Sequence, residues 1–102
     1  MEIKLLNNKI ILIKDTPLKT KDIIYYTVDS FTKREEFGYL KGVKLKLYTK
    51  QAKKFKFIFN KEYFHNANSS DYDLNGPVAE KKNQSLRRKI IKIFKELKLT
   101  LS

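Results

Sequence analysis

Alternation between apolar and lysine-rich positions in two neighbouring runs is the feature that most constrains how this chain can fold. Apolar side chains alternate with Lys44, Lys46 and Tyr48 in the first run, and with Lys54 and Lys56 in the second. A period of two places successive side chains on opposite faces of a β-strand. Each run therefore predicts a strand with one apolar and one basic face. The apolar positions are Val43, Leu45, Leu47, Phe55, Phe57 and Phe59.

The link from Lys50 to Lys53 is short enough to join these runs as an antiparallel hairpin, although it contains no Gly and no Asn-Gly pair. Such a hairpin would bring four lysines together on one face. Like charges directly opposite one another weaken a sheet. The lysines then either spread into solvent and protect an exposed strand from aggregation, or they are compensated by an anion. The sequence leaves both interpretations open.

The last quarter of the chain changes its period and predicts a C-terminal amphipathic helix over about 83–99. Its apolar side chains recur at three- and four-residue spacing, which is typical of one helical stripe. The stripe favours packing over the apolar face of the hairpin. The opposite face is basic and leaves a membrane surface or a polyanion open as a partner. The apolar residues are Leu86, Ile90, Ile91, Phe94, Leu97 and Leu101, and the basic ones are Arg87, Arg88, Lys92 and Lys95.

Shorter signals complete the predicted fold. A hairpin is expected over 2–14 with its turn at Asn7-Asn8, ending before Pro17, and a strand over 21–29. A polar segment follows over 30–36, and then a short strand or turn over 37–42. We expect one α+β domain over 1–102: a small, mainly antiparallel β-sheet or partial barrel, closed by one C-terminal amphipathic helix. It would be β-rich over 1–60 and carry an irregular loop over 61–79.

One stretch within this loop is similar to the start of a calcium-binding loop. Asp71, Asp73, Asn75 and Gly76 follow the spacing of the first ligands and of the turn glycine in an EF-hand. The twelfth position should be a bidentate glutamate, but it is Lys82. We therefore expect no metal site, only a loop whose side chains bond their own backbone.

Composition excludes several functional classes. The chain lacks cysteine and holds one histidine, His65, so it offers no thiolate metal site and no evident catalytic triad. It also lacks a Gly-rich phosphate loop and a nucleophile elbow. We expect a protein that is not an enzyme and needs no cofactor. The N-terminus has no signal-peptide pattern, so a cytoplasmic location is expected.

The formal net charge of +12 favours polyanionic partners. Residues 1–79 and residues 80–102 each contribute a balance of +6, so the last quarter is much more basic per residue. Nucleic acid, an anionic membrane surface and an acidic protein all fit this charge. Lysine-rich surfaces also keep a protein in solution, so the charge alone does not select a partner.

The order of strands and helix resembles the bacterial pleckstrin-homology-like domain. The resemblance rests on Leu18 to Tyr26, on the alternating runs 42–49 and 54–59, and on Leu86 to Leu97. Gln51-Ala52 departs from the family, which usually has Gly in the hairpin turn, and the loop from Asn60 to Pro77 is longer than the family pattern. The resemblance implies a non-catalytic scaffold whose ligands vary, so the fold does not fix the function.

Two functions of different class follow. The first is an interaction module that binds a protein or anionic partner through the basic strand face and the adjacent loop. The alternative is a small nucleic-acid-binding protein, in which lysines on the same face track phosphates and a tyrosine stacks a base. The predicted partner-binding residues are Lys44, Lys46, Tyr48, Lys54, Lys56, Arg87 and Arg88.

Overall fold

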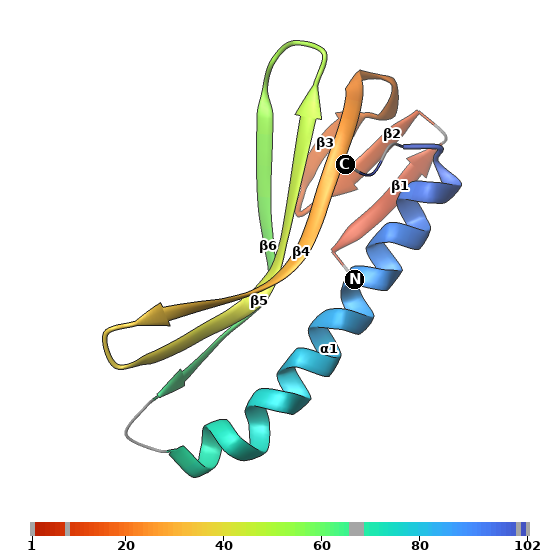
Figure 1. Ribbon diagram of the computed structural model, residues 1–102. Coiled ribbons are helices and arrows are strands. Elements are labelled where there is room, and N and C mark those ends of the chain that lie inside the picture. Colours follow the sequence, from red (N-terminus) through yellow and green to blue (C-terminus); the bar gives the residue numbers. More distant parts are fainter. Residues whose placement is uncertain (1, 8, 66–68, 100, 102) are drawn as a thin grey trace.

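Two three-stranded antiparallel sheets and one long helix make up the fold in the computed structural model (Figure 1). The structure describes the backbone of residues 2–7, 9–65, 69–99 and 101, and their side chains except those of 65–76. The α+β class is therefore confirmed, and the two sheets do not close into one barrel. The elements are β1 (Ile3–Asn7), β2 (Ile10–Ile13), β3 (Thr16–Lys19), the 3₁₀ turn η1 (Thr20–Asp22), β4 (Ile23–Glu35), β5 (Gly38–Thr49), β6 (Lys54–His65) and α1 (Ser69–Glu96).

The small sheet has the order β1-β2-β3 and contains the expected N-terminal hairpin. At its first turn the Asn7 side-chain oxygen accepts hydrogen bonds from the backbone N–H groups of Lys9 and Ile10, at 2.7 and 3.0 Å. The second strand of this hairpin ends at Ile13, before Pro17, as expected, but Pro17 itself pairs with Leu12 in a third strand, β3, which the sequence did not predict. This strand lies at the edge of the sheet, where a residue without an N–H group is tolerated.

The large sheet has the order β4-β5-β6, so β5 is its central strand. Its strands are longer than expected: β4 continues to Glu35 and β5 begins at Gly38. The polar segment over 30–36 and the short strand over 37–42 are therefore corrected to the end of β4 and the start of β5, which pair on either side of the turn that joins them. Polar side chains such as Lys33 and Arg34 are exposed there, while their backbones pair across the hairpin with Leu40 and Tyr39. Cross-strand pairing extends these strands beyond their apolar segments.

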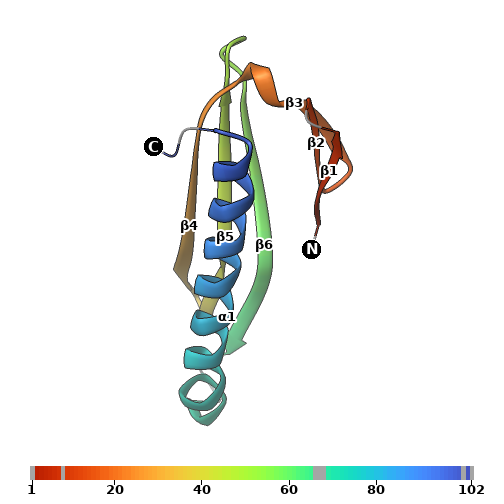
Figure 2. The ribbon, with the colours of Figure 1, turned by 90° about the vertical axis from the view of Figure 1, so that its right-hand side faces the viewer.

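Helix α1 covers one face of this sheet (Figure 2). Ile90 and Phe94 are completely buried, and the Phe94 ring meets the Tyr26 ring edge to face, with 4.6 Å between centroids. The prediction for the apolar face of the hairpin is confirmed: Val43, Leu45, Leu47 and Phe59 are buried, and Phe55 and Phe57 are half-buried. Burial raises the pKa of the Tyr26 phenol, and the nearby charge of Arg87 opposes this shift. Tyr26 is therefore uncharged at neutral pH.

The prediction of an irregular loop over 61–79 is wrong, because the start of this segment is a strand and its end is a helix. Residues 61–65 belong to β6, and residues 69–79 form the first turns of α1, which was expected to begin near 83. Residues 66–68 lie outside the described part. Ser and Asp favour turns, but they also favour helix N-termini, where they complement unpaired N–H groups and the helix dipole. The calcium-like stretch lies on this helix, so its backbone does not form an EF-hand loop.

Pro77 lies inside α1, and its replacement tests the early start of the helix. A proline in a helix interior removes one hydrogen bond and crowds the preceding turn, at a cost of about 3 kcal/mol. We expect Pro77→Ala to increase helicity by circular dichroism and to raise the free energy of unfolding by about 1–3 kcal/mol. No gain in helicity would mean that residues 69–79 are not helical in solution.

Phe94→Ala tests the contact between helix and sheet. Removing a fully buried phenylalanine costs its transfer free energy and leaves a cavity, together about 3–5 kcal/mol. We expect the midpoint of urea denaturation to fall accordingly. Lys95→Ala, at the exposed neighbouring position, should change stability by no more than about 0.5 kcal/mol. Equal stability of the two variants would contradict the packing of α1 described above.

Candidate binding surface

Four lysines gather on the face of the large sheet that α1 leaves uncovered. We call Lys44, Lys46, Lys54 and Lys56 the basic face. Lys46 lies directly opposite Lys56 in the register of β5 and β6, and Lys54 lies opposite Tyr48. Their neighbours Val43, Leu45 and Leu47 are buried on the other side of the sheet, because side chains alternate along a strand. The basic face is therefore the solvent side of the sheet.

The lysines are close enough to affect one another electrostatically. The charge of Lys56 lowers the pKa of Lys44, and partial desolvation and the charges of Lys46, Lys33 and Lys54 act in the same direction. Among the described residues, the four lysines of the basic face form no ion pair with a carboxylate. Asp29 is the cross-strand neighbour of Lys44 on β4. The basic face thus carries an excess of positive charge that an anion would relieve.

Aromatic rings accompany the lysines on this face. The Tyr25 and Tyr48 rings stack with centroids 4.3 Å apart, and the Lys54 ammonium lies 5.6 Å from the Tyr48 centroid. Tyr25 comes from β4 and Lys54 from β6, on opposite sides of the central strand that carries Tyr48. Tyr48 is therefore held between a ring and a cation. Of the two tyrosines, Tyr25 is the better placed to stack a base.

Phe31 is a further ring that the sequence analysis did not select. The Lys44 ammonium lies 5.4 Å from the Phe31 centroid. A Cβ atom on Gly42 would come within 3.0 Å of this ring, so glycine lets the ring lie over β5. Tyr25 and Phe31 were missed as site residues because both lie on β4. Only the register of β4 against β5 places them beside the lysines.

The two predicted arginines do not join the basic face. Both lie on α1, which covers the opposite side of the sheet. The Arg87 Nε atom donates a hydrogen bond to the Val28 carbonyl at 2.9 Å, and this contact holds the helix against β4. Arg88 is exposed on the helix. The structure therefore brings together five of the seven predicted residues and separates Arg87 and Arg88 from them.

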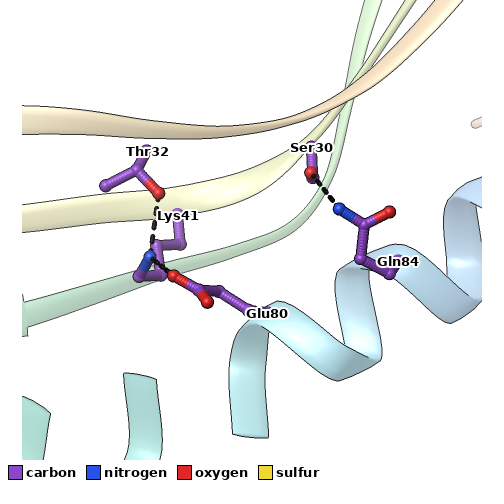
Figure 3. A network of polar contacts seen from close by, with 5 residues as sticks. All are labelled: Ser30, Thr32, Lys41, Glu80 and Gln84. Atoms are coloured by element: carbon purple, nitrogen blue, oxygen red, sulfur yellow. Dashed lines mark hydrogen bonds and ion pairs between the residues drawn. The ribbon is translucent and has the colours of Figure 1, made fainter. Parts of the chain in front are cut away.

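A polar network around Lys41, near the start of β5, fixes α1 against the sheet (Figure 3). The Lys41 side chain is only 2% exposed, and its ammonium lies 2.6 Å from a Glu80 carboxylate oxygen and 2.8 Å from the Thr32 hydroxyl. Nearby, Gln84 donates a hydrogen bond to the Ser30 hydroxyl at 3.0 Å. A buried cation needs such partners, so the network sets the position of the helix along β4 and β5.

The part of the chain that the structure describes contains no cluster of side chains suited to a metal site. No group of three or more His, Cys, Asp or Glu side chains there could hold an ion. The side chains of Asp71, Asp73 and His65 lie outside the described ones.

Removing the carboxylate of Glu80 tests the polar network. Glu80→Ala takes away the anion beside the buried Lys41 ammonium, and we expect a loss of about 1–3 kcal/mol in the free energy of unfolding. Lys41→Met removes the buried charge itself while keeping an unbranched chain, so it should cost less than Glu80→Ala. Glu96→Ala, exposed at the end of α1, is the control and should stay within about 0.5 kcal/mol. A larger loss for Lys41→Met would contradict this reasoning.

Comparison with known proteins finds no relative for this chain. No protein-family model matches it, and neither a curated protein nor a solved structure does. The resemblance to pleckstrin-homology-like domains therefore rests on the residues of the strands and the helix quoted above.

Proposed function

We propose that the chain is a small non-enzymatic interaction module, of the pleckstrin-homology-like type, that binds an anionic partner on its basic face. The observation that carries this proposal is the position of Lys44 and Lys46 on β5, with Lys46 directly opposite Lys56 of β6 and neither β5 lysine paired with a carboxylate among the described residues. An anionic protein surface or a phosphate-bearing partner laid across this face would offset the mutual repulsion. The proposal includes a cytoplasmic setting, which suits a chain without cysteine.

Protection against aggregation explains only part of this arrangement. Lysines on an edge strand discourage it from pairing with another chain. Lys54 and Lys56 lie on β6, which is an edge strand. Lys44 and Lys46 lie on the central strand, whose two edges are both already paired. Their adjacency to Lys54 and Lys56 has a cost and protects no edge, which favours a binding role for the basic face.

Single-stranded nucleic acid is the second candidate for this face. The stacked pair Tyr25 and Tyr48 is the specific observation in its favour, because a base can stack on the tyrosine pair while lysines contact the backbone phosphates. An anionic membrane would use the lysines alone. Among the described residues, no helix has the length and apolarity needed to cross a bilayer.

Charge reversal on the basic face tests the proposed function. We expect Lys44→Glu with Lys56→Glu to weaken binding of an anionic probe by at least about 2 kcal/mol, because each lysine near an anionic surface contributes about 1 kcal/mol. This corresponds to an increase of at least about thirtyfold in the dissociation constant. The control is Lys92→Glu with Lys95→Glu, which places the same charge change on the exposed surface of α1. Both variants lower the net charge of +12 by four units.

Fluorescence anisotropy at low and moderate salt measures this binding with three probes: polyglutamate, a short single-stranded oligonucleotide and phosphatidylserine vesicles. Selective loss of polyglutamate binding supports an acidic protein partner. Selective loss of oligonucleotide binding, with a further loss in Tyr25→Ala, favours nucleic acid. Selective loss of vesicle binding favours a membrane surface. Equal losses in the double variant Lys44→Glu with Lys56→Glu and in the helix control would contradict the proposal, since net charge alone would then explain binding.

A further inference from the structure

The free edge of β6 borders a second cationic surface. Among the described strands, β6 pairs with β5 on one side only, and the small sheet lies beyond its other edge (Figure 2). Six consecutive residues, 56–61, line an open groove of about 820 Å³ along this edge. We call this the edge groove. Its remaining lining residues are Glu2 and Lys14 from the N-terminal hairpin and Leu86 and Lys89 from α1.

The backbone of β6 presents hydrogen-bonding groups to the edge groove. The Lys14 ammonium donates a hydrogen bond to the Ile58 carbonyl and lies 5.0 Å from the centroid of the Phe59 ring. The Ile58 carbonyl therefore faces the groove and not β5. In an antiparallel strand, alternate residues direct both backbone groups to the same edge, so Lys56 shares this direction. Such an edge accepts a further strand through main-chain hydrogen bonds.

The charge of the edge groove selects the kind of strand that would fit. Lys14, Lys56, Lys61 and Lys89 line it, against the single carboxylate of Glu2, which lies 3.7 Å from the Lys14 ammonium. A second copy of this chain carries the same excess of lysine and would be repelled. Phe57 and Leu86 add apolar surface to the groove. An extended segment with acidic residues alternating with apolar ones complements both features.

We propose that the edge groove binds an extended acidic segment of a partner protein, which adds to β6 as a further β-strand. A backbone N–H of the segment donates a hydrogen bond to the Ile58 carbonyl in place of the Lys14 ammonium. The released ammonium then pairs with a carboxylate of the segment. The six lining residues of β6 span roughly 20 Å, enough for a segment of about six residues. The edge groove is distinct from the basic face, although Lys56 borders both.

A peptide of about ten residues with alternating Glu and Val, blocked at both ends, serves as the probe. Three matched peptides accompany it: one carries Lys in place of Glu, and the other two keep every side chain but are N-methylated at alternate residues, each in one of the two alternations. The pair of N-methylated peptides with opposite alternation covers both registers. Methylation of the N–H groups that face β6 removes main-chain pairing without changing the charge.

Three protein variants, each a double Lys→Glu change, locate the site. Lys61→Glu with Lys89→Glu alters the edge groove, Lys44→Glu with Lys46→Glu alters the basic face only, and Lys92→Glu with Lys95→Glu is the helix control. Titration calorimetry gives the affinities, and a thermal melt by circular dichroism verifies folding. Ile58→Pro is a fourth variant, which removes an N–H group that faces the groove and is not needed in the sheet.

We expect the edge-groove variant, Ile58→Pro, the lysine peptide and one of the N-methylated peptides each to weaken binding at least about tenfold. The basic-face variant and the helix control should stay within about threefold of the parent. The proposal is overturned if both N-methylated peptides bind like the unmodified one, if the basic-face variant loses as much affinity as the edge-groove variant, or if the acidic peptide does not bind at low salt. The basic-face variant changes one of the two surfaces and leaves the edge groove unaltered. If the edge groove does not bind the peptide, the proposed function of the basic face is therefore still decided by its own test.

Discussion

Burial of the inner face of β4–β6 beneath α1 is the constraint on which the rest of the structure depends. Phe94 and Ile90 of the helix belong to the same core cluster as Tyr26, Val28 and Leu45 of the sheet, and all of these side chains are fully or almost fully buried. The apolar side chains of the sheet are thereby committed to one face, and strand alternation directs the lysines to the other. The ion pair of Lys41 with Glu80 and the hydrogen bond from Arg87 to Val28 hold the helix at one position along the sheet. The basic character of the free face thus follows from the packing of the other.

The same packing leaves two cationic surfaces with different chemistry. The basic face is a sheet surface on which side chains alone meet a partner, so it suits a partner recognised mainly by charge. The edge groove offers backbone groups of β6 as well as lysines, so it suits an extended chain that can pair with a strand. Lys56 borders both surfaces, which means that one partner bound at the groove would influence another bound on the face through its charge. A module with two such surfaces fits an interaction role better than a role confined to solubility.

Much of the core and of the basic face could be predicted from local sequence. The alternation over 43–48 and 54–59 correctly placed Leu45 inside and Lys46 outside, because a period of two depends only on strand geometry. The helical stripe correctly placed Phe94 in the core. The ends of the elements were wrong, since β4 beyond Ser30, β6 beyond Asn60 and α1 before Asn83 depend on long-range pairing and packing that override weak local preferences. The position of Arg87 beside Val28, and of Tyr25 and Phe31 beside the lysines, likewise depends on tertiary contacts and register.

Backbone amide chemical-shift mapping of the labelled protein during titration with polyglutamate would show whether an anion binds on the basic face. We expect salt-sensitive shifts for Lys44, Lys46 and their neighbours on β4 and β6, with further shifts for 56–61 at the edge groove and small shifts on the exposed surface of α1. Shifts concentrated on Arg88, Lys92 and Lys95, with the sheet unchanged, would contradict this expectation and assign the binding role to the helix.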